Sequence, residues 1–244
     1  MVKLVDAITL RYNRAMGKRG PKPQAIDIKW SQNFAYFIGV LASDGCMSQD
    51  LRHLNITSKD KEMVENVKKI LKITNKIGKK ASGSEKRKKY YVLQFGNVSL
   101  CQFLLGIGIT PNKSKTIAKI QIPEAYFFDF LRGLFDGDGS IYSYFDKRWR
   151  SSFMIYISFA SASEKFIIWL QKTIFNLSGL KGHKVGGVNV SWLQLRYAKN
   201  EALALIKRMY KNKPGFCLER KKLKIKRILA TMLENKRRYK QTYS

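Results

Sequence analysis

Acidic residues are scarce in this chain of 244 residues, which carries 17 Asp and Glu against 47 Lys and Arg and so a formal net charge of +30. Such an excess of one sign disfavours the compact state through self-repulsion, and its usual counterpart is a polyanion, either a nucleic acid or an anionic membrane. The 45% of hydrophobic residues argue against a disordered tail, because they are enough to close one large core or two moderate ones. We therefore expect a folded, strongly basic protein.

Long apolar runs are missing as well. No run approaches the roughly 20 residues that a helix needs to cross a bilayer, and the first six residues, MVKLVD, lack the apolar middle of a signal peptide. We accordingly expect no membrane partner and an intracellular protein, in the cytoplasm of a microbe or within an organelle.

Cysteine is also rare. Cys46, Cys101 and Cys217 lie far apart, and no Cys-x-x-Cys pair occurs. This spacing supports neither a disulfide framework nor a zinc site. We expect all three to be small core residues.

Two segments of the sequence resemble each other. Residues 33–45 (NFAYFIGVLASDG) are echoed by residues 127–139 (FFDFLRGLFDGDG), and in each an apolar helical pattern ends in Asp-Gly. Each is followed by a candidate strand (51–57, 152–159), an amphipathic helix, a further strand (91–95, 191–195) and a last helix (98–105, 200–210). The sequence therefore predicts an α+β protein built from two pseudo-symmetric αββαββα repeats.

Basic residues are concentrated at the two ends of the chain, outside the repeats. Residues 1–30 hold seven cations against two acids, and the chain from Lys207 onward holds fourteen cations against two acids. We predict a basic N-terminal arm (1–30), a first repeat (31–107), a linker (108–123), a second repeat (124–210) and a basic C-terminal helix or tail (211–244). The two ends can be solvated flanks or phosphate contacts, and we favour phosphate contacts.

The nonapeptides at residues 37–45 (FIGVLASDG) and 131–139 (LRGLFDGDG) resemble the LAGLIDADG motif of homing endonucleases, in the monomeric form with two motifs per chain. The first copy carries Ala42 where the second has Asp136, at a position that does not hold the metal in that family. The resemblance covers about residues 31–210. It implies an intron-encoded, site-specific endonuclease that hydrolyses both strands of a long, loosely palindromic DNA target and leaves short 3′ overhangs.

The residue types of the motif explain its chemistry. Gly39 and Gly133 let two helices approach closely and pack about a pseudo-twofold axis. Asp44 and Asp138 then project from adjacent helix ends, where two carboxylates without a cation would repel each other. Mg²⁺ prefers oxygen ligands and serves phosphodiester hydrolysis, and Mn²⁺ or Ca²⁺ can replace it in binding. The pair therefore indicates a metal site.

The two aspartates also fit two simpler roles, a turn after a helix and a calcium-binding loop. Asp-Gly is a common turn after a helix, so a single copy would indicate no more than a turn. An EF-hand is excluded, because Ile141 and Lys147 stand where that loop needs glycine and glutamate. The matched pair favours metal binding, and the main chain at Gly45 and Gly139 is a further candidate for metal contact.

The resemblance also implies supporting residues. Ser58 and Ser161 stand where the family often has a larger, water-positioning side chain. Lys113 and Lys221 are the candidates for a basic residue that reaches the scissile phosphates and stabilises the charge of the transition state. In a chain so rich in lysine, the two lysines can equally be ordinary surface residues.

The same resemblance implies a curved antiparallel sheet in each repeat, the two forming a saddle on double-stranded DNA with the motif helices packed at the centre. Two-stranded ribbons fit the major groove, where arginine reads guanine and most lysines contact phosphates. The predicted DNA-binding residues are Arg52, His53, Lys76, Lys79, Lys80, Arg87 and Lys89 in the first repeat, and Tyr142, Tyr144, Lys147, Arg148, Arg150, Lys181, Lys184 and Arg196 in the second.

Two alternatives stay open at the level of sequence. One is an intron RNA maturase of the same fold, for which intron RNA would be the partner. The other is a DNA-binding regulator without catalytic activity. The presence of both Asp44 and Asp138 favours the nuclease over either.

Overall fold

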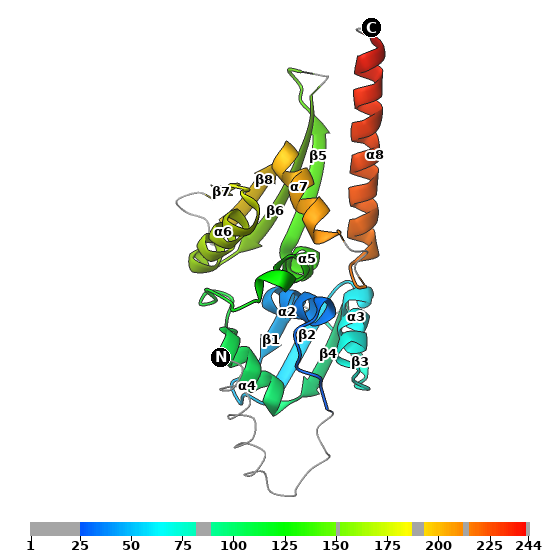
Figure 1. The fold of residues 1–244 in the computed structure, drawn as a ribbon. Coiled ribbons are helices and arrows are strands. Elements are labelled where there is room, and N and C mark those ends of the chain that lie inside the picture. The colour runs from blue at the N-terminus through cyan, green and yellow to red at the C-terminus, as the bar shows by residue number, and fades with distance from the viewer. Residues whose placement is uncertain (1–24, 82–88, 150–151, 187–192, 212–214, 243–244) are drawn as a thin grey trace, which may run out of the picture.

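The computed structural model describes residues 25–81, 89–149, 152–186, 193–211 and 215–242 (Figure 1). Arg87, Arg150 and most of the predicted N-terminal arm lie outside the described residues. Within the described ranges, no helix has the length and apolar character that a membrane span requires.

The chain folds as two repeats of one element order (Figure 1). The first repeat consists of α2 (Gln32–Asp44), β1 (Gly45–Met47), β2 (His53–Ser58), α3 (Lys61–Leu71), β3 (Ile77–Lys80), β4 (Tyr90–Gly96) and α4 (Val98–Ile107). The second consists of the short helix η1 (Glu124–Tyr126), α5 (Phe127–Asp138), β5 (Gly139–Phe145), β6 (Phe153–Ser161), α6 (Glu164–Ser178), β7 (His183–Val185), β8 (Leu193–Ala198) and α7 (Lys199–Met209). A further helix, α8 (Glu219–Thr242), follows the second repeat.

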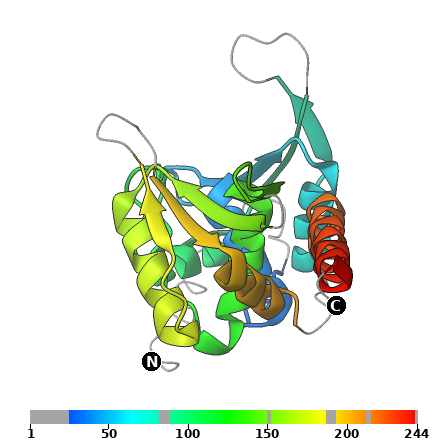
Figure 2. The same cartoon turned by 90° about the horizontal axis from the view of Figure 1, so that it is seen from above.

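Each repeat contains a four-stranded antiparallel sheet. The strand orders, β1-β2-β4-β3 and β5-β6-β8-β7, are equivalent in the two repeats. Side chains alternate between the two faces, so apolar residues such as Leu54, Ile56, Ile155 and Ile157 are buried on one face. Helices cover that face and leave the other open, as the view from above shows (Figure 2). The predicted fold class is confirmed.

The motif helices α2 and α5 pack against each other at the centre of the molecule (Figure 1). A Cβ placed on Gly39 would lie 2.1 Å from the carbonyl oxygen of Phe130, and one on Gly133 would lie 2.0 Å from that of Tyr36. The two backbones are therefore in direct contact at these glycines. Ser31 begins α2 by accepting a hydrogen bond from the Phe34 N–H at 3.1 Å.

Several expectations from the sequence need correction. The αββαββα order predicted four strands in each repeat but located only two of them, so β1, β3, β5 and β7 had no predicted bounds. Strand β2 begins at His53 rather than at residue 51, since the Asp50 carboxylate accepts hydrogen bonds from the Arg52 and His53 N–H groups and forms a turn there. Cys46 is exposed, whereas Cys101 is buried and Cys217 is intermediate, so the expectation of three core cysteines was wrong for Cys46.

The segment between the repeats does more than connect them. It forms no α-helix or β-strand before η1, yet Ile117 and Ile120 are buried in the core. The Gln121 N–H donates to the carbonyl oxygen of Ile107 at 2.8 Å. This segment is therefore fixed against the first repeat.

Helix α8 lies along the second sheet and contacts β5 and β6 (Figure 1). One side of its first turns is buried through Ile225 and Ile228. The opposite side is exposed and carries Lys226 and Arg227. The C-terminal basic region predicted from the sequence is thus helical from Glu219 onward.

Candidate metal and nucleic-acid site

Asp44 and Asp138 are the last residues of α2 and α5. The two helix ends are in contact, because a Cβ placed on Gly137 would lie 2.3 Å from Asp44 Oδ2 and 1.9 Å from Ser43 Oγ. The close crossing at the interface glycines thus brings together the two carboxylates that the sequence singled out.

Burial and mutual repulsion act on this pair. The pKa of Asp44 rises from 3.8 to about 6, chiefly because the carboxyl is buried and secondly because of the charge on Asp138. Burial also raises the pKa of Asp138, and the nearby Lys113 and Lys221 ammonium groups partly oppose that rise. Two neighbouring acids whose ionised forms are both disfavoured make a site that a cation stabilises.

The donor set fits a hard divalent cation. Asp44 Oδ2 is buried and has no hydrogen-bond partner among the described residues. Within those residues no cluster of three or more His, Cys, Asp and Glu side chains could hold a metal. The protein would therefore supply about two carboxylates and leave the remaining positions to water and phosphate oxygens, which is the usual arrangement for Mg²⁺ in phosphoryl chemistry.

The two predicted lysines occupy equivalent places at the helix ends. Lys113 follows α4 and donates from Nζ to the carbonyl oxygen of Gly45 at 2.7 Å. Lys221 lies in the first turn of α8 and donates to the carbonyl oxygen of Gly139 at 2.7 Å, and to further carbonyl oxygens of α5. Both are buried, which lowers the pKa of each lysine, that of Lys221 to about 8. A lysine therefore stands beside each aspartate.

These hydrogen bonds bear on the predicted main-chain ligands. The carbonyl oxygens of Gly45 and Gly139 each accept a lysine ammonium, so they already have a partner. The sequence predicted that these two carbonyl oxygens could contact a metal. A lysine ammonium already occupies each of them, so a metal ion would have to compete for the same oxygen.

Ser58 and Ser161 end the equivalent strands β2 and β6. Ser58 Oγ accepts a hydrogen bond from the Asp60 N–H at 3.1 Å, and Ser161 Oγ accepts one from the Ser163 N–H at 3.1 Å. Both hydroxyls thus shape the turn into the next helix, and each keeps its proton to donate to a water molecule.

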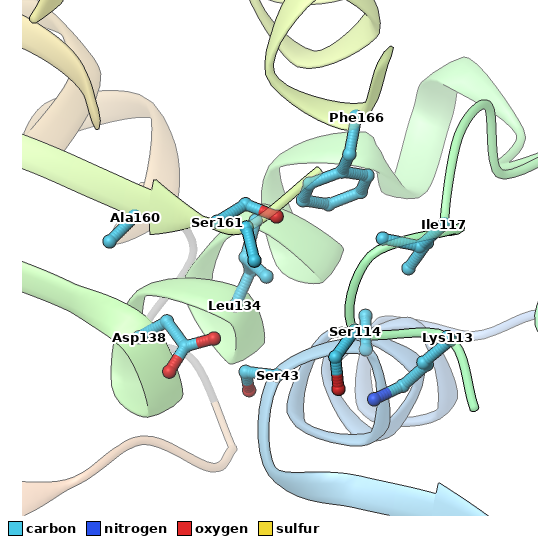
Figure 3. A pocket seen from close by; sticks show the side chains of 11 residues that line it. Ser43, Lys113, Ser114, Ile117, Leu134, Asp138, Ala160, Ser161 and Phe166 are labelled. Atoms are coloured by element: carbon cyan, nitrogen blue, oxygen red, sulfur yellow. The ribbon is translucent and has the colours of Figure 1, made fainter. Parts of the chain in front are cut away.

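A pocket of about 210 Å³ opens beside Asp138 (Figure 3). Lys113 and Ser114 form one side, Ser161 lies on the other, and Ser43 lies near Asp138 from the end of α2. The pocket combines a carboxylate, an ammonium group and hydroxyls from both repeats. The rest of the lining is apolar, including Ile117, Leu134 and Phe166, so these few polar groups are the ones that could meet a phosphate group or its water.

The open face of the second sheet carries an aromatic row. The rings of Tyr142 and Tyr156 stack with centroids 5.1 Å apart, and Tyr144 stacks on Tyr156 at 6.0 Å. The Arg196 guanidinium lies 5.9 Å and 5.8 Å from the ring centres of Tyr142 and Tyr156. The register brings three of the predicted DNA-binding residues onto one surface with Tyr156, which the sequence analysis missed.

The strand register places other predicted residues on the opposite face. Lys79 pairs with Tyr91 and Lys184 pairs with Leu195, so both lysines lie on the helix-covered side of their sheets. Lys79 Nζ lies 5.5 Å from the ring centre of Tyr91. Their assignment to the DNA-reading surface therefore needs correction, whereas Lys80, one residue on, lies on the open face.

The remaining predicted residues lie at the margins of the sheets. His53 is on the open face at the start of β2, where Nδ1 lies 2.5 Å from the Asp50 carboxylate. Arg148 pairs with Asp146 beyond β5. The other exposed cations near strand ends are Arg52, Lys76, Lys89, Lys147 and Lys181.

Asp136 is a functional candidate to which the sequence gave no role. It is completely buried, and its Oδ2 accepts hydrogen bonds from the Tyr36 hydroxyl at 2.9 Å and from the Leu218 N–H at 2.7 Å. The signal in the sequence was its replacement by Ala42 in the first motif, but both partners are distant along the chain.

Comparison with known proteins identifies the family. Residues 31–108 and 127–209 match the family model described as LAGLIDADG-like domain. The chain belongs to this LAGLIDADG family. No curated protein sequence matches the chain.

Solved structures of LAGLIDADG proteins share the fold. The homing endonuclease I-SmaMI, solved on uncleaved DNA with calcium ions, superimposes with a TM-score of 0.58 at 12% identity, over 86% of this chain and 93% of that one. I-LtrWI bound to its target DNA gives a TM-score of 0.53 at 10% identity, covering 84% and 96%. Full-length DUF199/WhiA from Thermatoga maritima gives 0.50 at 15% identity, covering 84% of this chain and 63% of that longer chain. At these identities the likeness concerns the fold alone.

Proposed function

We propose that this LAGLIDADG protein is a site-specific endonuclease that hydrolyses both strands of double-stranded DNA with the help of a divalent metal. The observation that carries the proposal is the meeting of Asp44 and Asp138 at the contact between α2 and α5, with a buried lysine beside each. The cluster lies where α2 runs into β1 and α5 runs into β5, the first strands of two equivalent sheets. Family membership and the DNA-bound neighbours support it.

Asp44 and Asp138 are the residues that would hold Mg²⁺, with Mn²⁺ or Ca²⁺ able to replace it in binding. A divalent cation held there would neutralise the carboxylates and supply the Lewis acid that polarises a phosphodiester. The unpartnered Asp44 Oδ2 and the raised pKa of both acids support this role.

The side chains of the protein would do the rest. Lys113 and Lys221 present buried ammonium groups, one for each DNA strand, that stabilise the negative charge added at the phosphate in the transition state. The hydroxyls of Ser43 and Ser161 line the pocket next to Asp138. Ser161 accepts the Ser163 N–H and can donate its own proton to a water molecule, whereas Ser43 donates to the carbonyl oxygen of Val40 and can only accept from water. No histidine is needed for these steps.

The two open sheet faces would read the target. The second carries Tyr142, Tyr156 and Arg196, and the first presents the neighbouring amides Asn55 and Gln94. Arginine favours guanine and amide side chains favour adenine in the major groove, whereas tyrosine rings offer apolar contact. Because the faces share a fold and differ in chemistry, the target would be long and loosely palindromic. Both motifs lie in one chain, so one copy would suffice, and the short 3′ overhangs follow from the family resemblance.

The proposal is tested by incubating the protein with a randomised duplex library and Mg²⁺ and sequencing the cut ends. We expect a single enriched site. On that site, Asp44→Asn and Asp138→Asn should each lower cleavage by about three orders of magnitude or more, because the metal and its charge stabilisation are lost. Duplex affinity should stay within about threefold, since phosphate and base contacts remain.

The matched control is Glu164→Gln, which removes an exposed carboxylate in the first turn of α6 and should cut like the wild type. Cleavage by either aspartate variant at the wild-type rate would contradict the assignment of the metal ligands. Tight, sequence-specific binding with no cut ends under any divalent metal would indicate a DNA-binding regulator. Preferential binding to structured RNA over duplex DNA would indicate a maturase.

A further inference from the structure

The two motifs differ in the chemistry of their sixth residue. The first has Ala42 there and the second has Asp136, which is 0% exposed and accepts both the Tyr36 hydroxyl and the Leu218 N–H on Oδ2. Burying a carboxylate is expensive unless hydrogen bonds compensate. Asp136 therefore has a role in the second repeat that the first repeat fulfils without an acid at residue 42.

The segment that Asp136 holds leads directly into α8. Leu218 is the residue before the helix begins, and the Lys221 and Lys222 N–H groups donate to its carbonyl oxygen. One helical turn before Asp136 in α5, Arg132 donates from Nε to the carbonyl oxygen of Phe216 at 3.1 Å. Two side chains of the motif helix thus fix the main chain at positions 216 and 218, and so the point where α8 starts.

The start of α8 decides where Lys221 lies. Lys221 is three residues beyond Leu218, and its Nζ donates to the carbonyl oxygens of Phe135 and Gly139, which flank Asp136 and Asp138. In the first repeat the equivalent Lys113 lies in a short turn after Pro111, where the Ile117 N–H donates to the Lys113 carbonyl oxygen at 2.8 Å. Lys113 is therefore positioned without a carboxylate at residue 42.

We propose that Asp136 is a positioning residue for Lys221: by accepting the Leu218 N–H it fixes the first turn of α8 and keeps the Lys221 ammonium at the end of α5. This inference rests on the proposed endonuclease function for its effect on cleavage. Because each lysine serves one helix end, losing Asp136 impairs the site around Lys221 and spares the site around Lys113. The two DNA strands are then cut at unequal rates.

The alternative is that Asp136 merely stabilises the core through Tyr36. Loss of that contact would lower the stability of the whole protein and slow the cutting of both strands alike. The variants separate these roles. Asp136→Ala removes both hydrogen bonds, Asp136→Asn keeps an oxygen that can accept them, and Tyr36→Phe removes the hydroxyl while leaving Asp136 to hold Leu218.

The first readout needs no DNA. The full-length protein is treated with an acylating reagent specific for amines, and the modification rates of Lys221 and Lys113 are compared by mass spectrometry. In Asp136→Ala we expect Lys221 to react at least about fivefold faster, because the turn that buries it opens locally, while Lys113 keeps its wild-type rate. Tyr36→Phe should leave both rates unchanged. Asp136→Asn keeps the hydrogen bonds but removes a charge that raises the pKa of Lys221, so it should speed Lys221 by clearly less than Asp136→Ala does and leave Lys113 unchanged. Should Asp136→Ala fail to fold by circular dichroism, Asp136→Ser, whose shorter side chain cannot reach Leu218, takes its place.

The second readout follows each strand of the selected duplex with its own label. Asp136→Ala should slow one strand by about tenfold or more relative to the other, through kcat rather than KM, because a displaced catalytic group costs rate rather than binding. Equal slowing of both strands, or an unchanged Lys221 reactivity, would overturn the inference. If the wild type cuts no DNA, the proposed function fails, and the lysine reactivities still decide whether Asp136 positions Lys221.

Discussion

Two buried carboxyl groups near the ends of the motif helices have raised pKa values, so their ionised forms disfavour the folded state. Asp44 and Asp136 are buried acids whose pKa values rise from 3.8 to about 6. In both, burial is the main cause. An acid whose pKa is higher in the folded than in the unfolded chain stabilises the fold below its unfolded pKa, and that contribution is lost as pH rises through its folded pKa.

The metal-free protein should therefore lose stability between about pH 4 and pH 7. Asp44→Asn removes one of the responsible charges and should make the protein more stable than the wild type at pH 7.5, by on the order of 2–3 kcal/mol. The difference should become small by about pH 3, where Asp44 is mostly protonated in both the folded and the unfolded chain. Urea unfolding in EDTA at several pH values measures it.

The same unfolding experiment is repeated with a divalent cation in place of EDTA. Mg²⁺ should raise the stability of the wild type at pH 7.5, because binding to the folded state alone shifts the unfolding equilibrium. Asp44→Asn should show no such gain. A pH profile shared by wild type and variant in EDTA would refute the electrostatic account of Asp44.

At the scale of elements, the crossing of α2 and α5 determines the site. Gly39 and Gly133 lie where each backbone meets the other, and their missing side chains set how near the helix ends come. Gly106, near the end of α4, is different, because a Cβ there would meet nothing within 4 Å. These three glycines allow a matched comparison.

Gly39→Ala or Gly133→Ala should lower the free energy of unfolding by roughly 3 kcal/mol or more, because the added methyl meets main-chain atoms that cannot move aside. Gly106→Ala should instead raise it by about 0.5–1 kcal/mol, since alanine favours the helix and the space is free. Chemical denaturation of the three variants checks both signs. A mild effect at Gly39 equal to that at Gly106 would mean that the helices can separate without cost.

Features that depend on residues close together in the sequence could be predicted, whereas features that depend on distant residues could not. Helical spacing and the repeated Asp-Gly allowed α2, α5 and the αββαββα order to be predicted. The direction of Lys79 and the stacking of Tyr156 depend on strand register, which neighbouring residues do not determine. The partners of Asp136 lie up to 100 residues away along the chain, so the sequence alone could not supply them.

At the scale of the whole molecule, the sheet face on which each cation lies matters as well as the net charge of +30. Cations on the open faces of the sheets can approach phosphates of one duplex together, whereas those on helix-covered faces cannot. Lys79 and Lys80 are adjacent in β3, both are exposed, and they lie on opposite faces. They provide a comparison at constant charge.

Binding to the selected duplex should weaken steeply with salt, and Lys80→Ala should reduce the logarithmic slope by about 0.9, the contribution of one phosphate contact. Lys79→Ala should leave the slope unchanged, although it removes the same charge. Titrations by fluorescence anisotropy at four salt concentrations measure both slopes. If the two variants lowered the slope equally, the net charge and not the sheet geometry would govern binding.

The position of Lys113 between the two repeats has a consequence for recombination between relatives. Lys113 belongs to the segment joining the repeats, bonds to Gly45 of the first repeat, and lines a pocket with Asp138 and Ser161 of the second. Neither repeat by itself supplies all of these residues, so the proposed site depends on both repeats and on the segment between them. A chimaera that exchanges repeats between relatives must carry residues 108–123 with the first half, or it will inherit an aspartate without its lysine.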